Sequence, residues 1–273
     1  YVSSEESALS HWIGDGMGTP VYGKRTFERG VNDRPTEVQN AETMAHIALI
    51  ARYGGQWFAS VGDAKAPGTC LVSVGGAVNA PGVIEVPVGT PVAEIISRCK
   101  GFSTEVSGFL TGGYGGAWVG TDNLMASDWS PESVAAEGGA IGAGILWALD
   151  ARVCALHEVA YVAQYMAGES AGQCGPCRFG LPSLADDLAT IAGKSAQMSD
   201  VHRLNTRIPL VQQRGGCKHP DGVARFVSSA MHVFHDEVAH HLRGRCSATT
   251  TGAVLPIEGM RPTPVGFAGK DFK

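Results

Sequence analysis

Residues 169–178 read ESAGQCGPCR and contain two cysteines, Cys174 and Cys177, separated by two residues. A third cysteine, Cys217, follows in the run GGCKHPDG at 215–222. Two thiolates at this spacing can bind one metal centre from a single turn, and a distant third thiolate can close around it. The pattern predicts iron–sulfur or zinc chemistry, and therefore either electron transfer or a structural metal.

Amphipathic helices are predicted on both sides of these cysteines. Apolar residues recur at helical spacing within 156–167, 181–191, 201–208 and 223–238. We expect Pro209 to break the third helix and Asp221 to cap the fourth. Four such helices with short connections favour a bundle. Both cysteine motifs precede a helix start, where backbone N–H groups favour a negatively charged thiolate or cluster.

The middle of the chain has a different pattern, with short β-branched runs punctuated by glycine and proline. Residues 71–74 and 83–88 flank the turn residues 79–82 and predict a β-hairpin, followed by a short helix after Thr90-Pro91. This is the outline of a β-grasp unit with one helix. It contains no histidine, so we expect an interface rather than a catalytic site. Its glycine-rich run, 112–116, is suited to close packing against a neighbouring domain or partner.

The remaining segments are simpler. Residues 41–53 predict a helix that ends at Gly54. The chain begins with Tyr1 rather than methionine, and we expect the true N-terminus to lie upstream. Residues 247–273 are rich in threonine, proline and glycine and predict an extended tail. The expected fold class is therefore α+β.

Composition limits the function. A formal net charge of -5 with 17% charged residues gives no basic surface for nucleic acid. No apolar run is long enough for direct membrane insertion, and no signal peptide opens the chain. Seven scattered cysteines do not form an even-numbered disulfide framework. We therefore expect a cytoplasmic protein, with peripheral membrane association only through a partner subunit.

Four motifs in order now point to a family. Residues 1–9 (YVSSEESAL) resemble Tyr-x-x-Gly-Glu-Glu-Thr-Ala-Leu, and 35–43 (PTEVQNAET) resemble Pro-Thr-x-Val-Asn-Asn-x-Glu-Thr. Pro67-Gly68-Thr69 and the hairpin after it resemble a soluble-ligand-binding (SLBB) β-grasp domain. Residues 169–178 resemble Glu-Ser-Cys-Gly-x-Cys-x-Pro-Cys-Arg. Over residues 1 to about 246, the chain resembles the NADH-oxidising flavoprotein subunit of respiratory complex I and its relatives in hydrogenases and formate dehydrogenases.

The resemblance implies a domain order and a function. It implies the C-terminal part of a flavin- and NADH-binding domain at 1–56, an SLBB β-grasp domain at 57–150, an iron–sulfur-binding four-helix bundle at 151–246 and an extended tail at 247–273. The expected function is electron transfer through a [4Fe–4S] cluster, as a component of an NADH-dependent oxidoreductase. Other subunits of a redox complex are the expected partners.

The resemblance covers only some of the family's flavin-binding residues. The resemblance places Glu5 and Glu6 by the flavin and nicotinamide, and Asn40 and Thr43 by the flavin phosphate. The family's glycine-rich phosphate loop precedes Tyr1, so we expect FMN and NADH to bind only when that region is present. Ser4 also stands where the family has glycine, and a side chain there can obstruct a ring. From the residues alone, Glu5-Glu6 are equally a solvated pair in a first helical turn.

The cluster motif departs from the family at one ligand. Ala171 occupies the position of the first cluster cysteine and cannot bind iron. The resemblance implies Cys174, Cys177 and Cys217 as ligands, and we select His219 as the fourth. Cys154, Cys246 or an iron without a protein ligand remain alternatives. Taken individually, Cys154 and Cys246 are expected to be small buried apolar residues.

Two other interpretations of the cysteines exist. Cys174-Gly175-Pro176-Cys177 is identical to the thioredoxin redox motif, but that motif follows a strand, and a helix is expected here. A structural zinc site of Cys174, Cys177, Cys217 and His219 is chemically well formed. It would make the protein a non-redox scaffold whose β-grasp domain binds a partner.

Overall fold

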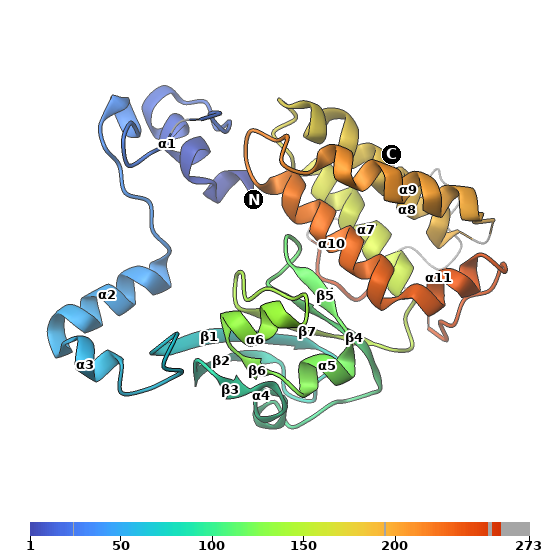
Figure 1. Cartoon of the computed structure of the whole chain (residues 1–273), viewed down its shortest axis with the longest axis horizontal. Coiled ribbons are helices and arrows are strands. Elements are labelled where there is room, and N and C mark those ends of the chain that lie inside the picture. Colours follow the sequence, from blue (N-terminus) through green and yellow to red (C-terminus); the bar gives the residue numbers. More distant parts are fainter. Residues whose placement is uncertain (24, 194, 251–252, 258–273) are drawn as a thin grey trace.

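The computed structural model describes residues 1–23, 25–193, 195–250 and 253–257. These residues form an N-terminal arm, a β-grasp sheet and a helical bundle (Figure 1). The fold is mixed α+β, as predicted. The arm contains η1 (Val2–Ser4), α1 (Glu6–Asp15), η2 (Val31–Asp33), α2 (Ala41–Tyr53) and α3 (Gly55–Phe58).

The sheet has five strands in the order β2-β1-β7-β4-β5. Strand β1 pairs antiparallel with β2 and parallel with β7, which is the mixed arrangement of a β-grasp unit. The predicted hairpin is therefore present as β1 and β2. The strands are β1 (Thr69–Gly76), β2 (Gly82–Pro87), β4 (Val106–Thr111), β5 (Ala117–Val119) and β7 (Ile145–Asp150), with β3 (Thr90–Pro91) and β6 (Asp128–Trp129) as a separate pair.

The expectation of one helix in this region is wrong. Three short helices accompany the sheet: α4 (Val92–Arg98), α5 (Thr121–Met125) and α6 (Pro131–Ala136). A local signal for α6 is present, because the Ser130 hydroxyl accepts a hydrogen bond from Ser133 N at 3.2 Å and Pro131 occupies the first turn. Helix α5 has no such side-chain cap.

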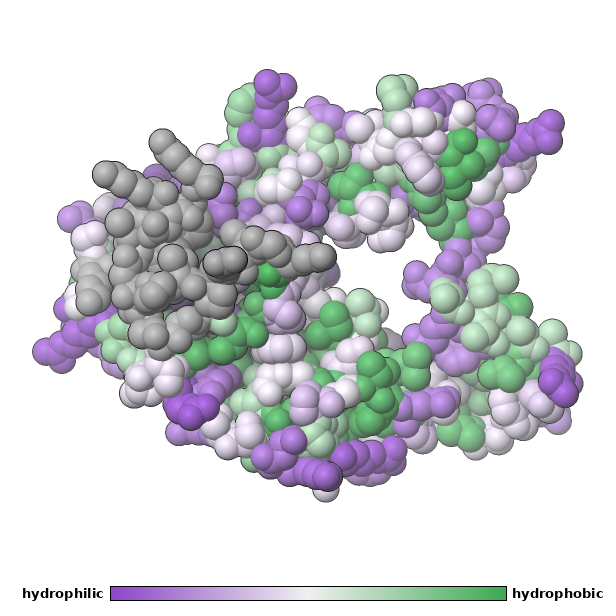
Figure 2. Space-filling view, turned by 180° about the vertical axis from the view of Figure 1, so that it is seen from behind, coloured by the Kyte–Doolittle hydropathy of each residue, from purple (hydrophilic) through white to green (hydrophobic). Residues whose placement is uncertain are grey.

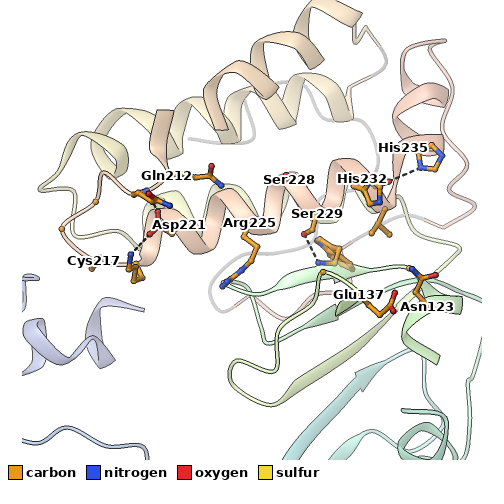
Figure 3. A pocket seen from close by; sticks show the side chains of 18 of the residues that line it. Asn123, Glu137, Gln212, Cys217, Asp221, Arg225, Ser228, Ser229, His232 and His235 are labelled. Carbon is orange, nitrogen blue, oxygen red and sulfur yellow. Dashed lines mark hydrogen bonds and ion pairs between the residues drawn. The ribbon is translucent and has the colours of Figure 1, made fainter. Parts of the chain in front are cut away.

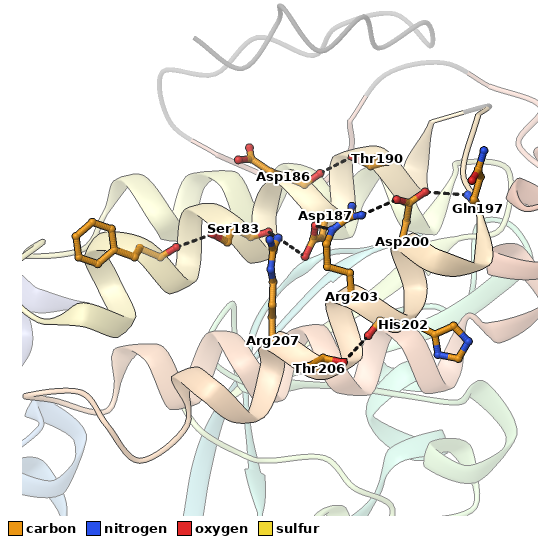
Figure 4. A network of polar contacts seen from close by, with 11 residues as sticks. Ser183, Asp186, Asp187, Thr190, Gln197, Asp200, His202, Arg203, Thr206 and Arg207 are labelled. Atoms are coloured by element: carbon orange, nitrogen blue, oxygen red, sulfur yellow. Dashed lines mark hydrogen bonds and ion pairs between the residues drawn. The ribbon is translucent and has the colours of Figure 1, made fainter.

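The bundle follows β7. It contains α7 (Ala155–Gly168), the π-helical turn η3 (Pro176–Gly180), α8 (Leu181–Ala192), α9 (Met198–Val211), α10 (His219–Val233) and α11 (His235–His241). Its core side chains include Leu156, Leu184 and Phe226, each at most 1% exposed. Between α8 and α9, buried Asp187 pairs with Arg203 and Arg207 (Figure 4).

Three details of the helix predictions are wrong. Pro209 lies inside α9, which continues to Val211. Proline there removes a single bond to the carbonyl of exposed Asn205, close to the helix end. Asp221 lies in the first turn of α10 rather than at its cap, and its carboxylate accepts from Gln213 N and Lys218 Nζ. The last predicted helix is divided at Phe234 into α10 and α11.

The glycine-rich run packs against α10, as predicted. A Cβ atom at Gly222 would lie 3.2 Å from Gly115 Cα, so glycine allows this approach. Arg225 Nη2 donates to Gly115 O at 2.6 Å, and Trp118 N donates to Ser229 Oγ at 2.9 Å. The β-grasp sheet and the bundle therefore share one interface along α10.

The described part of the predicted tail is extended but packed. Leu255 is 4% exposed, and Tyr114 Oη donates to Pro256 O at 2.6 Å. Residues 251–252 and 258–273 of that prediction lie outside the described residues. Among the described helices, none has both the length and the apolar character required to cross a lipid bilayer.

The N-terminal arm leaves many of its large apolar residues in solvent. Helix α2 contains no buried residue, and Met44, Ile47 and Trp57 are 46–52% exposed. Figure 2 shows this hydrophobic surface on the arm at its right side. Helical stability in proteins comes mainly from packing of an apolar face, and none of the described residues buries this one.

Candidate metal centre

The three motif cysteines converge on one pocket. Cys174 precedes η3, Cys177 lies within it, and Cys217 lies in the link between α9 and α10. Ala171 and His219 line the same pocket. A π-helical turn is uncommon and occurs often at functional sites. The structure therefore brings together the three predicted thiol ligands, the alanine in the family's fourth position and the predicted substitute. No strand leads into η3, which follows α7, as argued against the thioredoxin interpretation.

The surroundings of the thiols favour a bound cation. Burial disfavours the thiolate of Cys174, but backbone N–H groups of Cys177 and Gly216 outweigh this and lower its pKa. Burial, followed by the nearby Cys174 thiolate, raises the pKa of Cys177 to about 12. Cys177 interacts electrostatically with both Cys174 and Cys217, and neighbouring thiolates repel one another unless a metal centre shares their charge. The donor set therefore fits an iron–sulfur cluster or zinc.

His219 lines this pocket and has one ring nitrogen without a hydrogen-bond partner among the described residues. Its side chain is buried, with 1% of the residue exposed. Nε2 donates to Met166 O at 2.8 Å, while Nδ1 is buried without a hydrogen-bond partner among the described residues. Ala171 offers only a methyl group. Three cysteines and a histidine with one unpartnered nitrogen therefore line the same pocket.

The N-terminal segment covers the pocket. Gln173 Nε2 donates to Pro20 O, and the Tyr1 ring lies 5.4 Å from the His219 ring. Val2 also lines the pocket. On another side, Cys217 lies at one end of a groove of about 1090 Å³ that follows α10 opposite Asn123 and Glu137 of the β-grasp domain (Figure 3). The site is thus shielded on one side and near the surface on the other.

The predicted flavin residues are not brought together. Glu5 caps α1, because its carboxylate accepts from Ala8 N at 2.8 Å and Ser7 Oγ at 2.6 Å. Glu6 and Asn40 are exposed, and Thr43 is half-buried in α2. An extended link separates α1 from α2 in Figure 1. Of the pair expected in a first helical turn, Glu6 is exposed there and Glu5 lies one position earlier, at the N-cap, while the flavin assignment stays a prediction.

A second ligand cluster was missed by the sequence analysis. Cys154, Glu237, His241 and Cys246 place their ligand atoms within 4.8 Å of one another. Cys154 precedes α7 and Cys174 follows it, and 14 helical residues separate them by roughly 20 Å. Neither Cys154 nor Cys246 is thus placed to serve the first pocket. The available signal was the Glu237–His241 spacing of four residues on one helix, which the sequence analysis overlooked.

Two family models match the chain, one in the helical bundle and one in the β-grasp sheet. Residues 157–241 match the NADH-ubiquinone oxidoreductase-F iron-sulfur binding region, and residues 71–113 match the SLBB domain. The first match contains all three motif cysteines. These matches confirm the predicted SLBB domain and iron–sulfur-binding region.

The chain is also similar in sequence to curated redox subunits. The chain is 31% identical over 248 residues to an NADH-quinone oxidoreductase subunit from Streptomyces coelicolor, covering 90% of this chain and 55% of that protein. It is 30% identical over 262 residues to an NADP-reducing hydrogenase subunit from Solidesulfovibrio fructosivorans, covering 93% and 53%. The chain spans about half the length of these curated relatives.

A solved structure is similar over nearly the whole chain. The crystal structure of an NAD⁺-reducing [NiFe]-hydrogenase in the H₂-reduced state matches with a TM-score of 0.77 and 25% identity, covering 91% of this chain and 42% of the hydrogenase chain. The air-oxidised state matches with a TM-score of 0.78 at 23% identity, covering 96% of this chain and 44% of that one, and supports the fold.

Proposed function

Because this chain is homologous to the iron–sulfur-binding subunits of NADH-quinone oxidoreductase and of NAD⁺-reducing hydrogenase, we propose that it is an electron-transfer subunit. Cys174, Cys177 and Cys217 are the residues that would hold a [4Fe–4S] cluster. Such a cluster supplies uptake and release of single electrons at a potential set by its ligands. The convergence of these three thiols on one pocket is the observation that carries the proposal.

His219 is proposed as the fourth ligand. Its neutral ring, with Nε2–H bonded to Met166 O, presents a lone pair at Nδ1. A ligand histidine commonly donates its other N–H to a backbone carbonyl, which fixes its tautomer. The zinc alternative would use the same four side chains, so the metal itself must be identified by experiment.

The chain's own residues prepare the site in two ways. Backbone N–H groups of Cys177 and Gly216 stabilise the thiolate of Cys174. Gln173 and Tyr1 hold the N-terminal segment over the pocket, which limits access of water to one side. A drier site strengthens the electrostatic effect of each N–H donor.

We propose NADH as the electron donor of the complete protein and other redox subunits as its partners. The support is the homology together with the exposed apolar surface of α2 and α3. Glu5, Glu6, Asn40 and Thr43 are proposed to contribute to flavin and nicotinamide binding only with the region that forms the phosphate loop in the resembling family. The solvent-exposed Met44, Ile47 and Trp57 would then pack against another polypeptide.

Anaerobic purification with metal analysis tests the central proposal. We expect iron and acid-labile sulfide in equal amounts, sulfur-to-iron charge-transfer absorption, and an electron paramagnetic resonance signal after reduction. Cys174→Ser and Cys177→Ser should lose this absorption, whereas Cys70→Ser should keep it. Zinc in the Cys174 pocket of aerobically and anaerobically purified protein alike would contradict the redox role and support the scaffold.

A further inference from the structure

A second group of metal-binding side chains lies at the other end of α7. Cys154 precedes α7, Glu237 and His241 lie on α11, and Cys246 follows α11. Cys154, His241 and Glu237 are 3%, 1% and 8% exposed, and Cys246 is half-buried. Two thiols, an imidazole and a carboxylate thus meet in one enclosed place, with every pair of ligand atoms within 4.8 Å.

The three distances among Cys154, Glu237 and His241 are close to those of a tetrahedral site. Zinc–sulfur bonds of about 2.3 Å and zinc–nitrogen or zinc–oxygen bonds of about 2.0 Å give S···N or S···O edges of about 3.5 Å and N···O edges of about 3.3 Å. Here Cys154 Sγ lies 3.4 Å from His241 Nε2 and 3.9 Å from Glu237 Oε1. His241 Nε2 lies 3.0 Å from Glu237 Oε1.

We propose that Cys154, Glu237, His241 and Cys246 bind one zinc ion as a structural Cys₂HisGlu site. Zinc accepts sulfur, nitrogen and carboxylate oxygen together, and four protein ligands leave no open position for catalysis. The ion would neutralise a carboxylate that is otherwise buried beside two thiols. Ser247 N donates to Glu237 Oε1 at 3.0 Å and orients the carboxylate from outside the ligand set. Nε2 is the ligand nitrogen of His241, and Nδ1 carries the hydrogen.

The proposed ion joins segments that are distant in sequence. It ties the start of α7 to α11 and to the segment after α11. That segment continues to Thr249 and Thr250, whose N–H groups donate to Arg152 O at 2.8 and 3.0 Å. A cross-link between positions 154 and 246 closes most of the bundle into one loop, which lowers the entropy of the unfolded chain. The site therefore serves to hold the bundle closed, independently of the Cys174 pocket.

Metal analysis of the wild-type chain tests the proposal without any substitution. We expect one zinc per chain in addition to any iron. X-ray absorption at the zinc edge should show two sulfur neighbours at about 2.3 Å and two nitrogen or oxygen neighbours at about 2.0 Å. Absence of zinc would overturn the proposal, and so would zinc with three sulfur neighbours, because that set belongs to the Cys174 pocket.

Substitutions then separate the two sites. His241→Ala and Cys154→Ser should lose the zinc, whereas the exposed His235→Ala on the same helix and Cys70→Ser should retain it. Cys174→Ser should lose the iron and keep the zinc, so failure of the zinc site and failure of the electron-transfer proposal are distinguishable. If a variant does not fold, removal of zinc from wild type by a chelator should lower Tm, and added Zn²⁺ should restore it. Retained zinc in His241→Ala, or a Cys154–Cys246 disulfide found by thiol titration, would overturn the assignment.

Discussion

His219 Nε2 donates a hydrogen bond of 2.8 Å to the backbone carbonyl of Met166, on the last turn of α7. A carbonyl oxygen accepts and never donates, so this bond fixes the ring tautomer. Burial lowers the pKa of His219, so the ring is neutral at neutral pH. The bond thus connects α7 to the start of α10 and leaves Nδ1 with a lone pair and no partner among the described residues.

Replacement of the proposed fourth ligand should change the potential of the cluster. His219→Ala should keep most of the iron, whereas Ala171→Cys/His219→Ala should restore four protein ligands as four cysteines. Because imidazole donates less electron density than thiolate, the double variant should have a lower reduction potential than wild type, by on the order of 100 mV. Potentiometric titration followed by electron paramagnetic resonance measures this. Equal potentials for wild type and both variants would exclude His219 as a ligand.

Loss of Cys217 should affect both cofactor and fold. Cys217 connects the link before α10 to the Cys174 pocket, so Cys217→Ser should lose most of the iron and loosen the bundle. Iron content and amide hydrogen exchange across α10 measure the two effects. Cys70→Ser, in β1 of the β-grasp sheet, is the control and should leave both unchanged. A variant with full iron content would show that Cys217 is not a ligand.

Elements with local sequence signals were predictable. The helix predicted at 41–53 is present as α2, and the hairpin is present as β1 and β2, because periodicity and turn residues act over a few positions. Asp221 shows the limit of this reasoning. Its position suited a helix cap, but its carboxylate instead binds Gln213 N in the preceding link.

The two candidate sites differ in the same way: one has a local sequence signal and the other depends on tertiary packing. Cys174 and Cys177 form a local motif, and the position of Cys217 followed from a family resemblance, so the first pocket could be assembled from sequence. Cys154 belongs to a cluster whose other members lie at 237–246, and although Glu237 and His241 are four residues apart on one helix, no local pattern connects them to Cys154. Only the packing of α11 against the start of α7 brings these residues together.

Asp187 should stabilise the bundle through its two arginines. Its side chain is 2% exposed and accepts from Arg203 Nε at 2.6 Å and Arg207 Nη1 at 2.7 Å (Figure 4). Asp187→Asn should lower the free energy of unfolding by about 2 kcal/mol, less than for a fully buried pair because both arginines reach solvent. Urea unfolding followed by circular dichroism measures the loss. The exposed neighbour variant Asp186→Asn should change it by under about 0.5 kcal/mol, and an equal loss in both variants would contradict the assigned role.

Glu158 should make stability depend on pH. Its carboxylate is buried in α7 and accepts from Val254 N and Leu255 N at 3.0 and 2.9 Å. Burial raises its pKa from 4.5 to about 7 against the effect of these two donors. Between these values the folded chain binds more protons than the unfolded chain, so stability falls as pH rises. The contribution of protonated Glu158 is complete below pH 4.5 and is lost as pH rises through about 7.

Glu158→Gln keeps a neutral side chain of the same shape and should remove this dependence. Its unfolding free energy relative to wild type should therefore rise between about pH 5 and pH 8, by up to about 3 kcal/mol. Urea unfolding at a series of pH values measures the difference, in which pH effects common to both proteins cancel. Glu105→Gln, at an exposed glutamate, should run parallel to wild type. If Glu158→Gln also ran parallel to wild type, the buried carboxyl would titrate alike in the folded and unfolded chains, and burial would not govern its protonation.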